Sequence, residues 1–185
     1  ELAALKRANS WDQIDIQCLD AALHNRPERI AARLESLLAD QCGNYDRFFI
    51  AYADCGTGGG VDEVARKFGA ARLPGAHCYE FYASSAVFHA LSDAEPGTFY
   101  LTDFLAKHFD RLVVADLKLD KHPELEPQLF GHYRKVVYLA QVHDDTLRAS
   151  ATRAAERLGL PLEIIETGYG QLASSLQEQV VRMIP

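Results

Sequence analysis

The stretch that most constrains the fold is an apolar run that ends at a cysteine and a group of glycines. Residues 48–53 read FFIAYA and lead through Asp54 and Cys55 into the glycine-rich segment 56–60. A continuous apolar run that stops at glycines is typical of a strand covered on both faces. A helical pattern starts at Val61, so the stretch forms a strand–turn–helix unit. Ligands of open α/β sheets bind beyond the carboxyl ends of the strands, which is where this pattern places Cys55.

Strand and helix patterns alternate along most of the chain. Strands are predicted at residues 14–19, 48–54, 72–78, 98–101, 135–142 and 162–166, and helices at 27–42, 61–68, 84–91, 102–113, 144–158 and 171–183. Such alternation favours a mostly parallel sheet with helices on its faces. We therefore predict a single α/β domain over residues 1–185, built as a three-layer sandwich around a Rossmann-like sheet.

The start of the chain departs from this alternation. Residues 1–8 have a helical pattern from the first residue, with neither a cap nor an initiator methionine. If strands and helices alternate, a strand should precede this helix. We therefore expect the given chain to begin after the first strand of the fold.

Composition excludes several classes of partner. The 185 residues are 48% apolar, which suits a domain with a real core. A net charge of −7 without any basic cluster argues against binding to nucleic acid or to an anionic membrane surface. No apolar segment approaches the roughly 20 residues that span a bilayer. Four cysteines without regular spacing do not resemble a disulfide scaffold, so we expect a reducing, cytoplasmic setting.

Two cysteines are candidates for a metal site. Cys78 ends the extended pattern at 72–78, and neighbouring parallel strands would bring it to the same rim as Cys55. Thiolates are soft metal ligands, and zinc takes four ligands in all. His77 is the natural third candidate, although adjacent side chains on an extended chain point in opposite directions. Spacing alone leaves open that both cysteines are small buried apolar residues, because no CxxC pair is present.

The glycine-rich turn is a second candidate site. Backbone N–H groups at a helix start attract anions, so Gly56, Thr57 and Gly58 are candidates for binding a phosphate-bearing cofactor. The segment matches neither the dinucleotide fingerprint nor the P-loop pattern. The alternative is a tight strand-to-helix turn that needs the φ angles open to glycine.

Most of the other histidines are expected in loops or on the surface. They are His24, His108, His122, His132 and His143. His143 has the best claim to a functional role because it follows the buried strand pattern at 135–142 and so falls on the carboxyl rim. Cys18 and Cys42 are interpreted as a strand packing residue and a helix-end residue.

Four segments of the chain resemble the domain-of-unknown-function 1638 family. They read HNRPERI from His24, AYADCGTGG from Ala51, HCYEF from His77 and GTFYLTDF from Gly97. The resemblance covers essentially the whole chain, and the motifs are specific in combination.

The resemblance implies a metal site but no reaction. Members of the family are similar in three cysteines, a pattern that looks like a three-thiolate site. Cys55 matches the second of these cysteines and Cys78 the third, while the first has no counterpart in this chain. His77 stands where an aspartate often precedes the last cysteine. Some members are encoded near corrinoid-dependent methyl-transfer systems, which implies methyl-transfer proteins as partners and a role in one-carbon metabolism.

Three hypotheses follow. In the first, Cys55 and Cys78 bind zinc with His77 or an upstream cysteine, and an open position activates a small thiol, amine or methyl acceptor. In the second, the rim binds a small ligand or a partner protein without catalysis, and the two sulfurs lie more than about 5 Å apart, too far for one zinc ion. In the third, Cys55 is a nucleophile assisted by His77 or His143. The sequence does not decide whether the protein is an enzyme.

Overall fold

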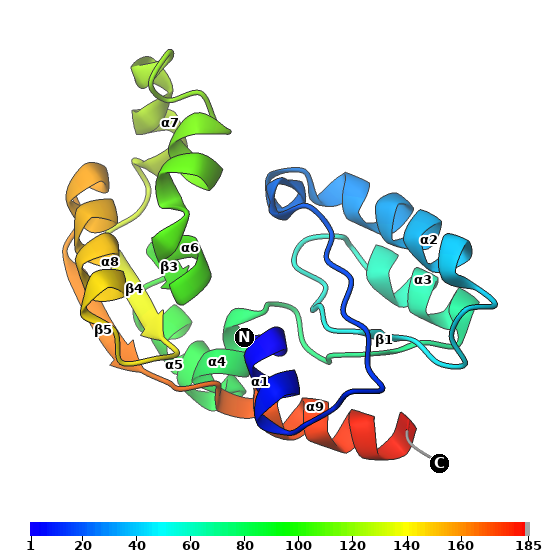
Figure 1. Ribbon diagram of the computed structural model, residues 1–185. Helices are drawn as coiled ribbons and strands as arrows, with labels where there is room; N and C mark the ends of the chain where they lie inside the picture. The colour runs from blue at the N-terminus through cyan, green and yellow to red at the C-terminus, as the bar shows by residue number, and fades with distance from the viewer. Residues whose placement is uncertain (184–185) are drawn as a thin grey trace. The chain divides into compact units, whose positions relative to one another are not determined.

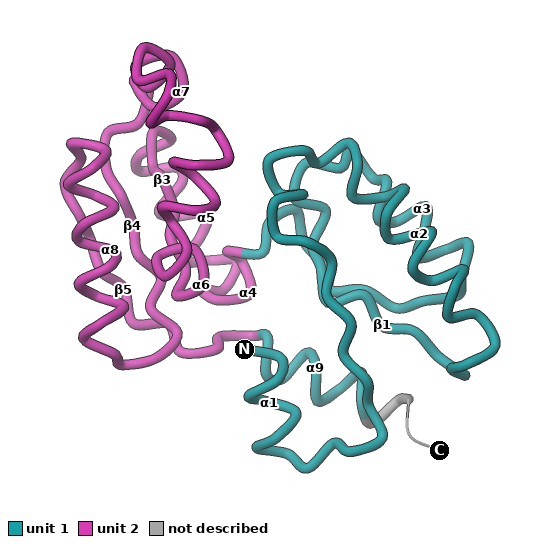
Figure 2. Tube along the Cα trace, turned by 45° about the horizontal axis from the view of Figure 1, so that its top comes forward, with its two compact units in different colours: residues 1–78, 172–185 teal, residues 79–171 magenta. Residues whose placement is uncertain are grey.

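The computed structural model describes residues 1–183, and the chain forms two compact units (Figures 1 and 2). The first unit consists of residues 1–78 and, within the described chain, 172–183, and the second is Tyr79–Gln171. Both contain parallel strands with helices packed on them, which confirms the predicted α/β class. That the whole chain acts as one domain stays a prediction.

The first unit holds a short parallel strand pair under two helices. Its elements are α1 (Leu2–Ala8), α2 (Ile30–Gln41), β1 (Phe49–Ile50), α3 (Gly60–Phe68), β2 (Ala71–Arg72) and most of α9 (Gly170–Met183). Helices α2 and α3 bury their apolar faces around Ile50 of β1, through Leu34 and Leu38 on α2 and Val61 and Val64 on α3. Apolar residues three and four apart on each helix make this packing possible.

The second unit is a three-layer sandwich around a parallel sheet in the order β3-β4-β5. Its elements are α4 (Tyr79–Ala83), α5 (Ser85–Ala94), β3 (Thr98–Thr102), α6 (Asp103–Lys107), α7 (Glu126–Phe130), β4 (Lys135–Ala140), α8 (Asp145–Leu158) and β5 (Leu162–Glu166), with a π-helical segment at Asp110–Ala115. Because strand side chains alternate between faces, Val136 and Tyr138 pack in the cluster with α6 and α8. Val137 and Leu139 pack in the cluster with α4 and α5.

A buried carboxylate ties the carboxyl ends of β3 and β4 together. Asp103 follows β3 and accepts hydrogen bonds from the Tyr138 hydroxyl (2.6 Å) and from the N–H groups of Gln141 (3.1 Å) and Val142 (3.0 Å). The Gln141 side chain accepts in return from the Asp103 N–H at 2.7 Å. Each group of this buried network therefore has a partner, as a low-dielectric interior requires.

The strand predicted at residues 14–19 does not form. Residues 13–20 have no regular secondary structure, and within the described chain no strand pairs with them. An alternating pattern predicts which face would be buried, but a strand also needs a pairing partner. The side chain of Asp15 instead accepts a hydrogen bond from the Tyr45 hydroxyl at 2.9 Å.

None of the helices within residues 1–183 has the length and hydropathy needed to cross a bilayer.

We expect replacement of Asp103 to destabilise the second unit strongly. Asp103→Ala leaves a buried hydroxyl and two amide groups without an acceptor, so the free energy of unfolding should fall by about 3 kcal/mol or more, measured by urea denaturation. Glu163→Gln is the matched control. It breaks an exposed ion pair with Lys135 and should cost less than about 1 kcal/mol. Equal losses in the two variants would contradict the role of Asp103.

Candidate metal site

Backbone pairing beyond β1 and β2 brings two distant segments of the first unit together. The Leu73 N–H donates to the Ile50 carbonyl (3.1 Å), and pairing resumes where Asp54 donates to Gly75 (3.3 Å) and Cys55 to Ala76 (2.8 Å). The two strands are thus shorter than predicted, but their parallel course extends beyond them. This course delivers the side chains of Cys55 and Cys78 to the same place.

The two cysteine sulfurs lie 3.0 Å apart, and both thiols are half-buried and free. The predicted convergence of Cys55 and Cys78 is therefore confirmed. The separation is also well under the 5 Å beyond which two sulfurs no longer fit one zinc ion.

His24 completes a group of three metal-binding side chains. One ring nitrogen of His24 and the sulfurs of Cys55 and Cys78 all lie within 4.8 Å of one another. His24 sits on the single helical turn Ala21–Asn25, which Asp20 caps by accepting from the Ala22 N–H at 2.9 Å. Leu23 packs against the α2–α3 core and anchors this turn. His24 itself is exposed, so the group is open on the side of its imidazole.

The histidine expected in this position was a different one. His77 is not among the three residues of the group. Within the described part of the chain, His24, Cys55 and Cys78 are the group of potential metal ligands that lie close enough together to hold one ion. His143 belongs to the second unit, where its Nδ1 lies 3.2 Å from a guanidinium nitrogen of Arg148. Sequence reasoning placed His24 among the surface histidines. The available signal was that His24 opens the first of the motifs that carry the family resemblance.

Tyr52 lies against the imidazole of the group. Its hydroxyl is 3.1 Å from Nε2 of His24, and the two ring centroids are 5.3 Å apart. Burial, followed by the nearby charges of Cys55 and Cys78, raises the pKa of Tyr52 well above its usual range. The phenol therefore stays protonated, and it holds the imidazole of His24 from one side.

The two thiols share a proton unequally. The hydrogen bond from Cys55 lowers the pKa of Cys78 to about 5, with a further contribution from His24 and against the effect of burial. The same hydrogen bond and burial raise the pKa of Cys55. One thiolate and one thiol is therefore the expected state near neutral pH, and a cation would favour ionisation of both.

Asp54 organises the glycine-rich turn beside the cysteine. Its carboxylate accepts from the Thr57 hydroxyl, from the Gly58 N–H (3.1 Å) and from the Gly59 N–H (2.8 Å). A phosphate at Gly56, Thr57 and Gly58 would have to displace Asp54 from donors that it already occupies. Phosphate binding at this turn stays a prediction that this geometry does not favour.

The backbone at Cys55 is in a rare conformation. Its φ angle is +46°, in the left-handed region that few residues other than glycine, asparagine and aspartate adopt. The hydrogen bonds on either side, from Cys55 to Ala76 and from Thr57 to the Asp54 carbonyl (3.1 Å), hold it there. Strain of this kind persists where the surrounding structure fixes it, and it concentrates at functional sites.

Arg72 fixes the segment that carries Cys78. Its guanidinium donates to both carboxylate oxygens of Asp62 on α3, at 2.6 and 2.9 Å, and also to the Leu73 carbonyl. A bidentate pair of this kind is geometrically specific. It therefore ties the turn after β2 to helix α3, whose first residues follow the glycine-rich turn.

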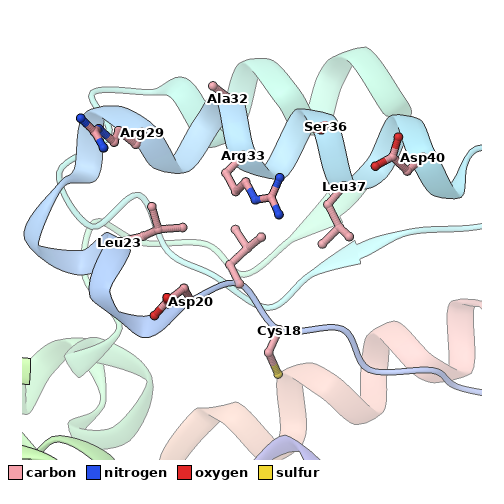
Figure 3. A pocket seen from close by; sticks show the side chains of 10 residues that line it. Cys18, Asp20, Leu23, Arg29, Ala32, Arg33, Ser36, Leu37 and Asp40 are labelled. Carbon is pink, nitrogen blue, oxygen red and sulfur yellow. The ribbon is translucent and has the colours of Figure 1, made fainter. Parts of the chain in front are cut away.

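A shallow groove of about 600 Å³ lies elsewhere in the same unit, between α2 and residues 18–23 (Figure 3). Arg33 and Leu37 point from α2 toward this segment, and Leu23 faces them. Cys18 lies at the edge of the groove and is exposed, not packed in a strand as interpreted from the sequence. Cys18 therefore differs in its surroundings from the paired thiols.

Comparison with known proteins identifies the family. Residues 18–176 match the family described as "Protein of unknown function (DUF1638)". The chain belongs to this family. The match includes His24, Cys55 and Cys78, so all three residues of the candidate site fall within the family region. No curated protein and no solved structure matches the chain.

We expect Asp54→Ala to loosen the glycine-rich turn. The variant removes the acceptor of three hydrogen bonds at a half-exposed site, so the free energy of unfolding should fall by about 1–2 kcal/mol at neutral pH. Hydrogen bonds, first that from Thr57, lower the pKa of Asp54 below its ordinary value of 3.8. Its contribution is therefore fully present above that value and is lost as the pH falls through the lowered pKa.

The measurement is urea denaturation of both proteins at a series of pH values. The difference between wild type and Asp54→Ala should shrink in acid, and Asp54→Asn, which keeps one acceptor oxygen, should lie between them. A difference that does not change with pH would contradict the assignment.

Proposed function

We propose that this protein binds a zinc ion through His24, Cys55 and Cys78, and that the site is the functional centre of the chain. The observation that carries the proposal is the 3.0 Å separation of two unbonded sulfurs with an imidazole in reach. Among the described residues, this group is the one that meets the requirements of a metal site.

The ligand types favour zinc. Thiolates are soft ligands, and imidazole suits zinc and other late transition metals. Two sulfurs that each lie about 2.3 Å from a tetrahedral zinc ion are about 3.8 Å apart, so the thiols would have to separate by under about 1 Å. Half-burial of the cysteines and exposure of His24 leave room for such a small adjustment.

Three protein ligands leave a fourth position in a tetrahedral shell, as in catalytic zinc sites. His24 is exposed, so a small molecule can reach the group from the side of its imidazole. A zinc ion held by these residues would supply a positive charge that lowers the pKa of a thiol bound to it. A methyl acceptor has to be a nucleophile, and an ionised thiol is one. This chemistry supports the link to one-carbon transfer and to methyl-transfer proteins as partners.

The surroundings of the site support the same assignment. A histidine that binds a metal generally donates its other ring N–H to a neighbouring acceptor, which fixes the ring. The Tyr52 hydroxyl lies 3.1 Å from a ring nitrogen of His24 and can hold the imidazole in this way. A reducing compartment such as the cytoplasm would keep the thiols available. The non-catalytic alternative expects the two sulfurs to lie too far apart to share an ion, and their 3.0 Å separation does not favour it.

Metal content tests the proposal directly. Purified protein, dialysed against zinc and then against buffer, should retain one zinc ion per chain by elemental analysis. Cys55→Ser and Cys78→Ser should lose it. His24→Ala should weaken binding by more than the roughly 10–100-fold that loss of an outer partner costs.

Matched controls use residues of the same type outside the group. His77→Ala and Cys18→Ser should retain zinc, because neither residue belongs to the group. Loss of zinc in His77→Ala with retention in His24→Ala would transfer the histidine role to His77. Absence of zinc from the wild-type protein would refute the proposal.

A further inference from the structure

We propose that Cys55 and Cys78 are also a site of reversible oxidation, in which a peroxide joins them in a disulfide and the metal ion is released. The release of metal rests on the proposed function. Formation of the disulfide does not, because it requires only the two thiols.

The geometry brings the sulfurs close to bonding distance. They are 3.0 Å apart and unbonded, and a disulfide bond is about 2.05 Å long, so closure needs a movement of about 1 Å. Their backbones lie on segments that are paired by hydrogen bonds from Asp54 to Gly75 and from Cys55 to Ala76. The pair is thus held together by the fold. Both thiols are half-buried, which admits a small oxidant.

The arrangement matches that of a redox-sensitive pair. An accessible cysteine beside a second, resolving cysteine is the usual form of such a pair. Cys55 and Cys78 have this arrangement, because their free sulfurs lie 3.0 Å apart and both side chains are half-buried. Either thiol can therefore react with the peroxide while the other resolves the product.

The reaction balances with a peroxide as the only oxidant. The thiolate of one cysteine attacks one oxygen of hydrogen peroxide, the O–O bond breaks, and a sulfenic acid forms. The departing hydroxide takes from solvent the proton that this thiol had released and becomes water. The sulfur of the other cysteine then attacks the sulfenic sulfur. The S–S bond forms, the S–O bond breaks, and the departing hydroxide takes the proton of the second thiol. Two thiols and one peroxide give one disulfide and two waters, and each sulfur loses one electron.

Oxidation removes the metal because the thiolate is the form of cysteine that binds it. In the disulfide both sulfurs are neutral, which leaves His24 as the remaining ligand of the group. A single imidazole does not hold zinc against dilution, so each disulfide formed should release one ion. Reduction by a dithiol regenerates the thiolates and the site.

The test uses a variant in which Cys55 and Cys78 are the two cysteines that remain. The chain has four cysteines, and Cys18 and Cys42 are exposed and lie outside the group, so Cys18→Ser/Cys42→Ser leaves Cys55 and Cys78 alone. The zinc-loaded, reduced variant is treated with increasing hydrogen peroxide. A chromophoric chelator reports released zinc, and intact mass reports the loss of two hydrogens.

We expect release of essentially all bound zinc, in proportion to the species that has lost two hydrogens. Dithiothreitol should restore the reduced mass and the capacity to bind zinc. With Cys55→Ser added, the mass should instead rise by added oxygen and no internal disulfide should form. Peptide mapping of the oxidised wild-type chain gives the same test without substitutions.

Oxygen addition to the individual cysteines of the paired variant without loss of two hydrogens would overturn this inference. So would retention of both thiols at peroxide concentrations that oxidise Cys18 in the wild-type protein. The two proposals fail separately. A protein that never binds zinc but forms the disulfide refutes the proposed function alone, and a zinc-binding protein that forms no disulfide refutes the oxidation alone.

Discussion

The parallel course of two chain segments beyond β1 and β2 is the constraint on which the site depends. Hydrogen bonds from Asp54 to Gly75 and from Cys55 to Ala76 continue the pairing past the last strand residues. Twenty-three positions separate Cys55 from Cys78 along the chain, and this pairing brings their sulfurs to 3.0 Å. The pairing in turn rests on the core that α2 and α3 form around Ile50.

The imidazole reaches the site by a different route. His24 lies on a single helical turn, and a turn of that length is not stable by itself. It is held by the Asp20 cap and by burial of Leu23 against the α2–α3 core. One hydrophobic cluster thus positions the strand pair that carries the thiols and the turn that carries the histidine. Tyr52 then lies against the imidazole from the chain segment that leads to Cys55.

Local signals in the sequence predicted the parts of the fold that depend on neighbours along the chain. The helices predicted to start at residues 84, 102 and 144 do start there, after the capping side chains of Ser84, Thr102 and Asp144. The helices predicted at 61–68 and 144–158 end before Gly69 and Gly159. The convergence of Cys55 and Cys78 was also predictable, because parallel strands deliver their ends to one edge.

The strand at 14–19 and the choice of histidine depend on contacts between distant residues. The alternating pattern at 14–19 is real, but no strand within the described chain pairs with it. His24 reaches the thiols through the burial of Leu23 and not through any periodicity around it. His77 adjoins Cys78 in sequence, yet the group contains His24 in its place. Adjacent residues on an extended segment face opposite ways, so nearness in sequence to a ligand is poor evidence of sharing its site.

X-ray absorption at the zinc edge of the metal-loaded protein tests the central claim most directly. Two sulfur neighbours at about 2.3 Å and a nitrogen or oxygen shell at about 2.0–2.1 Å, including imidazole scattering, are the predicted result. A spectrum with nitrogen and oxygen neighbours alone would show that the paired thiols do not bind the ion and would contradict this account.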